Sequence, residues 1–214
     1  AVDAANNNHI IVGAENGGVW RTIDAGETWS PLCDYFSNMD VYSVTIDPSN
    51  SDTYFFGSSS GRIYKSEDTG ATWNELVDLG NSKINKILMN PDNTDILFAS
   101  SENAGLFTSF DGGDTWSFPI TDDNRSYDIE FKPQDPSIVY ATGEKFHKST
   151  DGGLTFETIT STFEVNPKMM GVTPDDSTVI YVIESEGGSF NALYKSTDDG
   201  ETFTELDHAG RNYF

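Results

Sequence analysis

The sequence lacks several features that define common functional classes. It has one cysteine, Cys33, so an intrachain disulfide cannot form, and no cysteine or histidine spacing resembles a zinc site. Only 12 of its 214 residues are Lys or Arg, against 35 Asp or Glu, and the formal charge of −23 repels phosphate backbones and anionic lipid surfaces. No apolar run approaches the roughly 18 residues of a membrane helix. We therefore expect no nucleic-acid partner and no membrane insertion.

What the sequence has instead is a repeated acidic turn. The segments "RTIDAGETW", "KSEDTGATW", "TSFDGGDTW", "KSTDGGLTF" and "KSTDDGETF" share the pattern (Ser/Thr)-x-Asp-x-Gly-x-Thr-(Trp/Phe). Their aspartates are separated by 44, 43, 40 and 47 residues, a period that indicates a propeller or a solenoid. The residues of the pattern are Thr22, Asp24, Gly26, Thr28, Trp29, Ser66, Asp68, Gly70, Thr72, Trp73, Ser109, Asp111, Gly113, Thr115, Trp116, Ser149, Asp151, Gly153, Thr155, Phe156, Ser196, Asp198, Gly200, Thr202 and Phe203.

The other parts of the unit repeat as well. A turn containing proline recurs in four units, and apolar residues alternate just before it, as Val44 and Ile46 do, which predicts a strand with one buried face. Nearly continuous apolar runs such as "TYFFG" follow the turn and predict a strand covered on both faces. A third strand leads into the acidic turn, and the aromatic residue beyond that turn begins a short fourth strand. Each unit is therefore predicted to be a four-stranded antiparallel meander.

The length of the unit predicts an all-β fold. Four strands in about 43 residues match one blade of a β-propeller, whereas a β-solenoid, the alternative, has shorter coils. We place five consecutive blades at approximately residues 1–38, 39–82, 83–124, 125–165 and 166–214. Residues 2–13 align without a gap on residues 46–57, and the chain ends just before the next blade is due to begin. We therefore expect a segment of a larger propeller of six to eight blades.

The acidic turn resembles the Asp-box, also called the BNR repeat. That resemblance implies a hairpin between the third and fourth strands of each blade, at the outer periphery and away from the axial channel. An Asp at a turn accepts hydrogen bonds from backbone N–H groups, and Gly permits positive φ. A hydrogen-bonded turn that stabilises a hairpin is needed once per blade, whereas catalysis needs one site per protein. We predict a structural role for the five boxes and expect no metal and no other cofactor.

A calcium site or a catalytic role for the box aspartates is the alternative. A calcium loop places oxygen ligands at alternate positions and ends in Glu. The position of the second acid in "DGGD", Asp114, is held by Ala71 and Leu154 in two other copies, which disfavours a ligand role.

The scattered arginines and histidines indicate no further site. Asp-box propellers include sialidases, which hold a substrate carboxylate with three arginines, and their N-terminal arginine motif is absent here. His147 stands where other blades have Trp20, Tyr64, Phe107 and Tyr194, so we predict that it packs as those aromatic residues do. The remaining arginines and histidines are Arg21, Arg62, Arg125, Arg211, His9 and His208.

The amino-acid sequence of whole repeat units, such as "GGVWRTIDAGETW", resembles that of the large secreted propeller proteins of Bacteroidetes-type bacteria, which are sortilin-like or glycosyl-hydrolase-like. The resemblance implies an extracellular or cell-surface location and passage through type IX secretion machinery. Two functions stay open. One is a non-catalytic module that binds a protein or a polysaccharide. The other is a glycoside hydrolase, which needs two carboxylates about 5 to 10 Å apart, and the sequence does not identify such a pair.

Overall fold

The computed structural model describes residues 1–33, 40–80, 82–159, 163 and 167–208, with the side chains of Pro167 and Lys168 excepted. The chain divides into two compact units, Ala1–Ser117 (unit 1) and Phe118–Phe214 (unit 2). The described residues form strands joined by turns, and among them there is no helix with the length and apolar character that crossing a bilayer requires.

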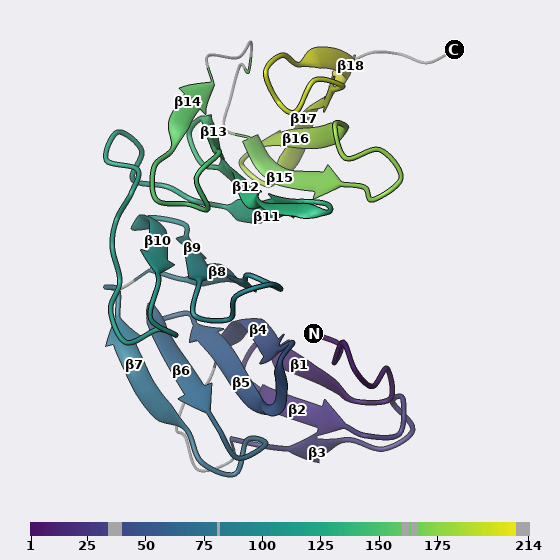
Figure 1. Ribbon diagram of the computed structural model, residues 1–214, viewed down its shortest axis with the longest axis vertical. Coiled ribbons are helices and arrows are strands. Elements are labelled where there is room, and N and C mark those ends of the chain that lie inside the picture. Colours follow the sequence, from purple (N-terminus) through teal and green to yellow (C-terminus); the bar gives the residue numbers. More distant parts are fainter. Residues whose placement is uncertain (34–39, 81, 160–162, 164–166, 209–214) are drawn as a thin grey trace. The chain divides into compact units, whose positions relative to one another are not determined.

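Unit 1 contains three antiparallel sheets, each built from strands that follow one another in the chain (Figure 1). The isolated bridges Val2–Ile10 and Thr108–Ser117 mark the places of a first strand in the first sheet and a fourth strand in the third. The strands are β1 (Ile10–Ala14), β2 (Gly18–Thr22) and β3 (Ser30–Pro31); β4 (Val41–Asp47), β5 (Asn50–Ser58), β6 (Arg62–Ser66) and β7 (Asn74–Asp78); and β8 (Ile84–Met89), β9 (Leu97–Ser101) and β10 (Gly105–Ser109).

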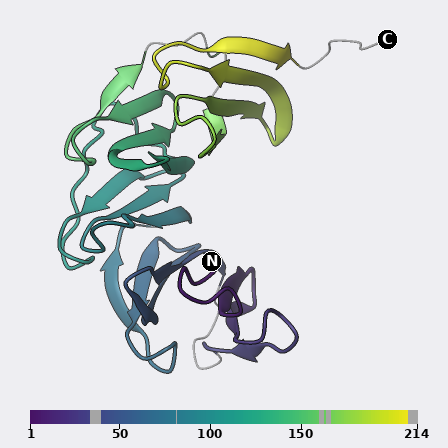
Figure 2. The same cartoon turned by 45° about the vertical axis from the view of Figure 1, so that its right-hand side comes forward.

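Unit 2 contains two four-stranded antiparallel sheets, again in chain order (Figure 2). The fourth sheet consists of β11 (Asp128–Lys132), β12 (Asp135–Thr142), β13 (Phe146–Ser149) and β14 (Glu157–Ile159). The fifth consists of β15 (Pro167–Val172), β16 (Ile180–Glu186), β17 (Ser189–Ser196) and β18 (Thr204–His208). The predicted all-β class and the order of the meander are confirmed.

Within each unit the hydrophobic cores lie between successive sheets, and β5 contributes side chains to two of these cores. In β5, Tyr54 and Phe56 pack with Ile11 of the first sheet, whereas Phe55 belongs to the cluster that contains Ile84 of the third sheet. Alternate residues of a strand point to opposite faces, so one continuous apolar run serves two interfaces. The prediction of a strand covered on both sides is confirmed for β5.

Small residues let neighbouring sheets of unit 1 approach closely. A Cβ atom added to Gly57 would lie 2.5 Å from Cγ2 of Ile84, and one added to Gly13 would lie 2.4 Å from Cγ1 of Val41. The strands β4 and β8, which begin the second and third sheets, therefore pack directly on the backbone of β1 and β5 in the preceding sheets. Cys33 is 4% exposed and belongs to the core between the first two sheets.

In unit 2, aromatic rings join the fourth and fifth sheets. Phe146 of β13 packs edge-to-face on Phe203, the aromatic residue of the last box, with ring centroids 4.9 Å apart. Phe163 contacts both Phe203 and Tyr194. The long connection between residues 186 and 194 extends the β16–β17 hairpin, since Glu186 pairs with Ser189 at its tip.

Candidate functional site

All five acidic turns have the same hydrogen-bond pattern, and each is complete within its own hairpin. In the third copy, Oδ1 of Asp111 accepts from Oγ of Ser109 at 2.8 Å and from the backbone N–H of Thr115 at 2.8 Å. Oδ2 accepts from Oγ1 of Thr115 at 2.6 Å, and Oγ of Ser109 accepts from the N–H of Gly113 at 2.9 Å. The other four copies repeat these bonds.

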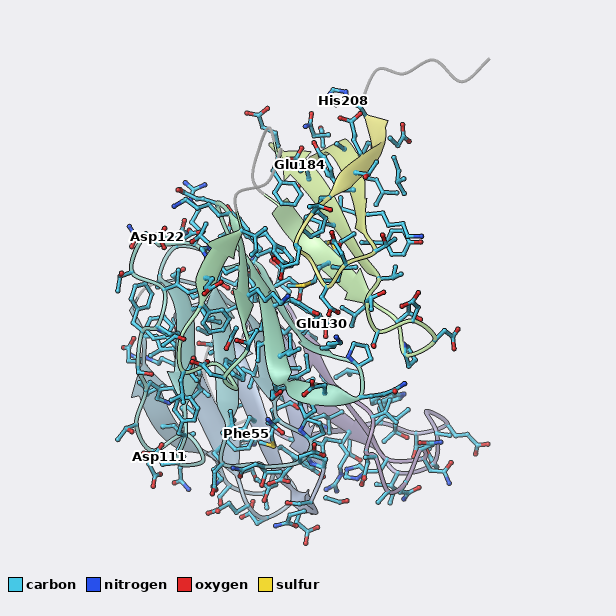
Figure 3. All side chains as sticks on the ribbon, turned by 45° about the horizontal axis from the view of Figure 1, so that its top comes forward. Phe55, Asp111, Asp122, Glu130, Glu184 and His208 are labelled. Carbon is cyan, nitrogen blue, oxygen red and sulfur yellow. The ribbon has the colours of Figure 1, made fainter. Side chains whose placement is uncertain are left out.

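The backbone of the turn explains the glycine of the pattern. The glycine has a φ of 97° at Gly26 and at Gly113, in the left-handed region that residues with a side chain rarely adopt. Asp111 lies at the surface of unit 1 on the turn after β10 (Figure 3). The five aspartates belong to five different sheets, and each is brought together only with the serine or threonine residues of its own copy.

The hydrogen bonds keep the box carboxylates ionised. The hydroxyls of Thr22 and Thr28 lower the pKa of Asp24 to about 2. For Asp151, desolvation acts upward, but the bonds from Thr155 and Ser149 outweigh it and lower the pKa to about 2. A carboxyl group in this state is a poor proton donor near neutral pH.

The aromatic residue of the box lies close to the turn or to the adjacent sheet. Nε1 of Trp29 donates to the carbonyl of Gly26 at 3.1 Å, and Nε1 of Trp116 donates to that of Gly113 at 2.9 Å. Trp73 instead donates to the carbonyl of Leu32 in the preceding sheet at 3.3 Å.

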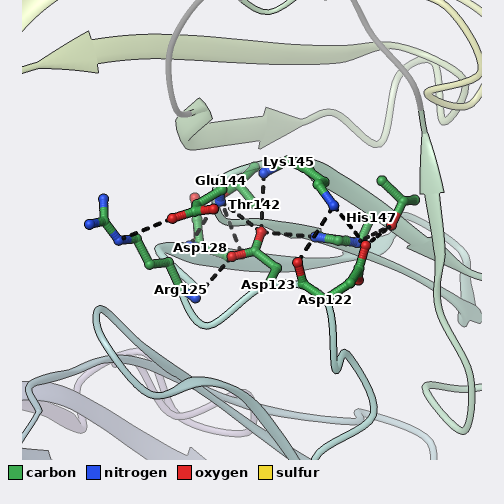
Figure 4. Close-up of polar contacts among 9 residues, drawn as sticks. Asp122, Asp123, Arg125, Asp128, Thr142, Glu144, Lys145 and His147 are labelled. Atoms are coloured by element: carbon green, nitrogen blue, oxygen red, sulfur yellow. Dashed lines mark hydrogen bonds and ion pairs between the residues drawn. The ribbon is translucent and has the colours of Figure 1, made fainter.

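A second group of polar side chains lies at the fourth sheet and in the loop before it, and consists of Asp122, Asp123, Lys145, His147 and Thr158 (Figure 4). Asp123 is 2% exposed, and one of its oxygens accepts from Nε2 of His147 at 3.1 Å. Nδ1 of His147 lies 3.2 Å from Oγ1 of Thr158. We call these five residues the Asp123–His147 cluster.

Asp123 also ties its own loop to the turn that precedes β13. Its carboxylate accepts from the backbone N–H groups of Arg125 at 2.9 Å, Glu144 at 2.7 Å and Lys145 at 3.1 Å. Desolvation raises the pKa of Asp123, but the bonds from His147 and the backbone outweigh it and lower the pKa below its ordinary value. Its neighbour Asp122 is exposed and pairs with Nζ of Lys145 at 2.7 Å.

The sequence predicts only a packing role for His147, and the structure adds a hydrogen-bonding role. His147 is buried at the aromatic position, as expected, but both of its ring nitrogens face polar partners. The replacement of the aromatic residue by histidine in one blade is the sequence feature that could have indicated this hydrogen-bonding role. Its partner Asp123 lies 24 residues earlier, a separation that no local pattern reveals.

The first and second sheets, both in unit 1, enclose a third polar group beside a pocket of about 420 Å³. Asp3 is 3% exposed, and its Oδ2 lies 2.8 Å from Nδ1 of His9. Nε2 of His9 lies 2.7 Å from the hydroxyl of Tyr54. Arg21 donates to the carbonyl of Thr69 at 2.8 Å.

A buried glutamate in the fifth sheet is the last candidate. Glu184 is fully buried, and its Oε2 accepts from Nδ2 of Asn191 at 3.0 Å and from the hydroxyl of Tyr194 at 3.4 Å. Across the described ranges, no three His, Cys, Asp or Glu side chains gather in a way that could hold a metal ion.

Solved structures with the same fold include several enzymes. An ancestral GH74 enzyme superimposes with a TM-score of 0.82 at 20% identity over 99% of this chain and 31% of its own. The GH74 enzyme of Niastella koreensis gives a TM-score of 0.74 at 23% identity over 99% of this chain and 37% of its own. The structure of YCF48 bound to D1 peptide gives 0.58 at 16% identity over 93% of this chain and 78% of its own.

These similarities confirm the predicted β-propeller fold, and the chain spans about a third of the length of the two GH74 enzymes. A search of the curated proteins found no match. The family model described as "Sortilin, neurotensin receptor 3" matches residues 17–116 and 104–214, which together cover most of the sequence. The chain therefore belongs to the Sortilin-Vps10 family.

Proposed function

We propose that this chain is a non-catalytic binding module of a secreted or cell-surface protein, and that its ligand is a protein or a polysaccharide. The proposal includes the Asp-box role of the five acidic turns, which fasten hairpins, and export through type IX secretion machinery. It assigns the binding to groups that differ between the sheets, because the repeated turns have the same geometry in every copy.

The environment of the acidic side chains is the observation that supports this proposal best. In the described part of the chain, the nine carboxyl groups whose pKa is shifted by their surroundings are all shifted downward: Asp3, Asp24, Asp68, Asp111, Asp122, Asp123, Asp151, Asp176 and Asp198. A glycosidase requires one carboxyl group that keeps its proton near neutral pH, and enzymes obtain it by raising the pKa. The buried acids Asp3 and Asp123 accept hydrogen bonds from neighbouring groups, which favour the ionised form.

The second candidate is a glycoside hydrolase that acts on a polysaccharide. The TM-score of 0.82 with an ancestral GH74 enzyme favours it, as does the structure described as the GH74 xyloglucanase from Xanthomonas campestris, with a TM-score of 0.60. Since this chain covers 31% and 44% of those two proteins, a catalytic role would belong to a larger assembly of blades.

One experiment separates the two functions. The purified chain is run through native gels that contain xyloglucan, mannan or pectin, and the same mixtures are assayed for new reducing ends. Retarded migration without release of reducing ends supports the binding module. Release of reducing ends that disappears when a single carboxylate is changed to its amide would instead establish the hydrolase.

A further inference from the structure

One wall of the pocket between the first and second sheets consists of polar side chains, at positions where packing of the repeat does not require polar residues. His9 occupies the register position held by Thr53, Ile96, Ile138 and Val179 in the other sheets, and Tyr54 occupies the position held by Ile10, Leu97, Val139 and Ile180. Aliphatic side chains therefore serve packing at most of these positions. Burying an imidazole and a phenol instead costs desolvation unless each polar atom has a partner.

The wall is a directed chain of hydrogen bonds. Asp3 is held as a carboxylate by the N–H of Ala5 at 2.8 Å and by His9, so Nδ1 of His9 carries the proton that it donates to Asp3. Nε2 of His9 lies 2.7 Å from the hydroxyl of Tyr54. The chain therefore runs from Asp3 through His9 to Tyr54, which lines the pocket together with Arg21.

Arg21 is fixed but not saturated by its contacts. Its guanidinium has five N–H donors, of which one goes to the carbonyl of Thr69 at 2.8 Å. The guanidinium therefore reaches the pocket in a set orientation with further donors to offer. Such preorganisation lowers the entropic cost of binding a ligand.

The remaining lining groups decide which ligand fits. Asn6, Ser51 and Thr69 supply amide and hydroxyl groups, and Asp52 adds a second carboxylate to that of Asp3. Two carboxylates and one guanidinium line the pocket, so an ion of either sign meets at least one group of its own sign there, whereas a neutral ligand meets no such opposition. A neutral ligand that both donates and accepts hydrogen bonds can use all of these groups.

We propose that this pocket binds a neutral polyhydroxylated ligand, a sugar residue of a polysaccharide, with Arg21 as its main hydrogen-bond donor. This inference rests on the proposed binding function and specifies its ligand class and its site. The pocket volume of about 420 Å³ falls within the range of small-molecule sites.

The test uses calorimetric titration of the full chain with four tetrasaccharides. Cellotetraose and mannotetraose are neutral, tetragalacturonate is anionic, and the tetramer of glucosamine is cationic. We expect at least one neutral probe to bind more tightly than either charged probe. We expect Arg21→Ala to weaken that binding about tenfold or more, as loss of hydrogen bonds from a charged donor predicts.

Two further variants make the result specific. Lys195→Ala changes the same register position in the fifth sheet, outside the pocket, and is expected to leave the dissociation constant unchanged. Arg21→Lys keeps the charge but loses the forked donors, so it should weaken binding while the thermal midpoint stays near that of the original chain. This variant keeps the test valid if Arg21→Ala fails to fold.

Three results would overturn the inference: neither neutral probe binds, a charged probe binds more tightly, or both Arg21 variants bind the neutral probe as well as the original chain does. If a polysaccharide still retards the Arg21 variants in native gels, the pocket assignment fails while the proposed binding function stands. Release of reducing ends would refute the proposed function without bearing on Arg21.

Discussion

Replacing Asp123 by alanine should destabilise unit 2 strongly, although no strand residue is changed. The carboxylate is 2% exposed and accepts four hydrogen bonds, from three backbone N–H groups and from His147. Alanine leaves all four donors without this acceptor. A buried donor left unpaired costs about 1–3 kcal/mol, and these backbone groups are only partly buried, so we expect a loss of about 3–4 kcal/mol.

That loss is large against a total stability of about 5–15 kcal/mol for a domain. The matched control is Asp122→Ala, which removes the neighbouring acid. Asp122 is exposed and makes an ion pair with Lys145, and pairs of that kind contribute about 1 kcal/mol or less. Asp123→Asn, which keeps one acceptor oxygen, should fall between the two.

Hydrogen exchange measured by mass spectrometry suits this question because all four tryptophans belong to unit 1, whereas exchange reports directly on the amides of unit 2. Asp123→Ala should reduce protection in the peptides that contain Glu144 and Lys145 and lower the thermal midpoint of unit 2. Unchanged protection together with an unchanged midpoint would refute the reasoning.

The lowered pKa of Asp123 adds a pH dependence. A carboxyl group whose pKa is lower in the folded state stabilises the fold above its unfolded pKa of about 3.9, and that stabilisation is lost as the pH falls through the folded pKa. The original chain should therefore lose stability in this acidic range, and the loss should be smaller in Asp123→Asn. Identical acid profiles would contradict the assignment.

Two further predictions concern the repeat. Asp111→Ala should remove hydrogen-exchange protection from the amide of Thr115, whereas Asp114→Ala should leave it, and neither calcium nor a chelator should shift the thermal midpoint of the original chain. A calcium-dependent midpoint would favour a metal site. Gly57→Ala should cost about 1–3 kcal/mol in urea unfolding because its Cβ would lie 2.5 Å from Cγ2 of Ile84. If the clash is the cause, the double variant Gly57→Ala/Ile84→Ala should lose less stability than the sum of the losses in the two single variants. Losses that simply add would disprove the overlap.

The fold could be predicted from the sequence because it depends on local hydrogen-bond patterns and on the periodicity of the strands. The partners of each box aspartate lie within four residues of it, so five copies of a short motif specify five similar turns. The run around Phe55 predicts a strand covered on both faces because side chains alternate along a strand. These inferences need no knowledge of which sheets meet.

The polar groups that distinguish one sheet from another depend on contacts over longer distances. His9 meets Tyr54 across 45 residues, and Asp123 meets His147 across 24. The residue types were visible as departures from the repeat, but their pairing was not, because it depends on which strands and loops pack together. The sequence by itself determined the blade and its fastening turn through local interactions, and the tertiary structure alone decided which buried histidines gained carboxylate partners and which side chains share a pocket.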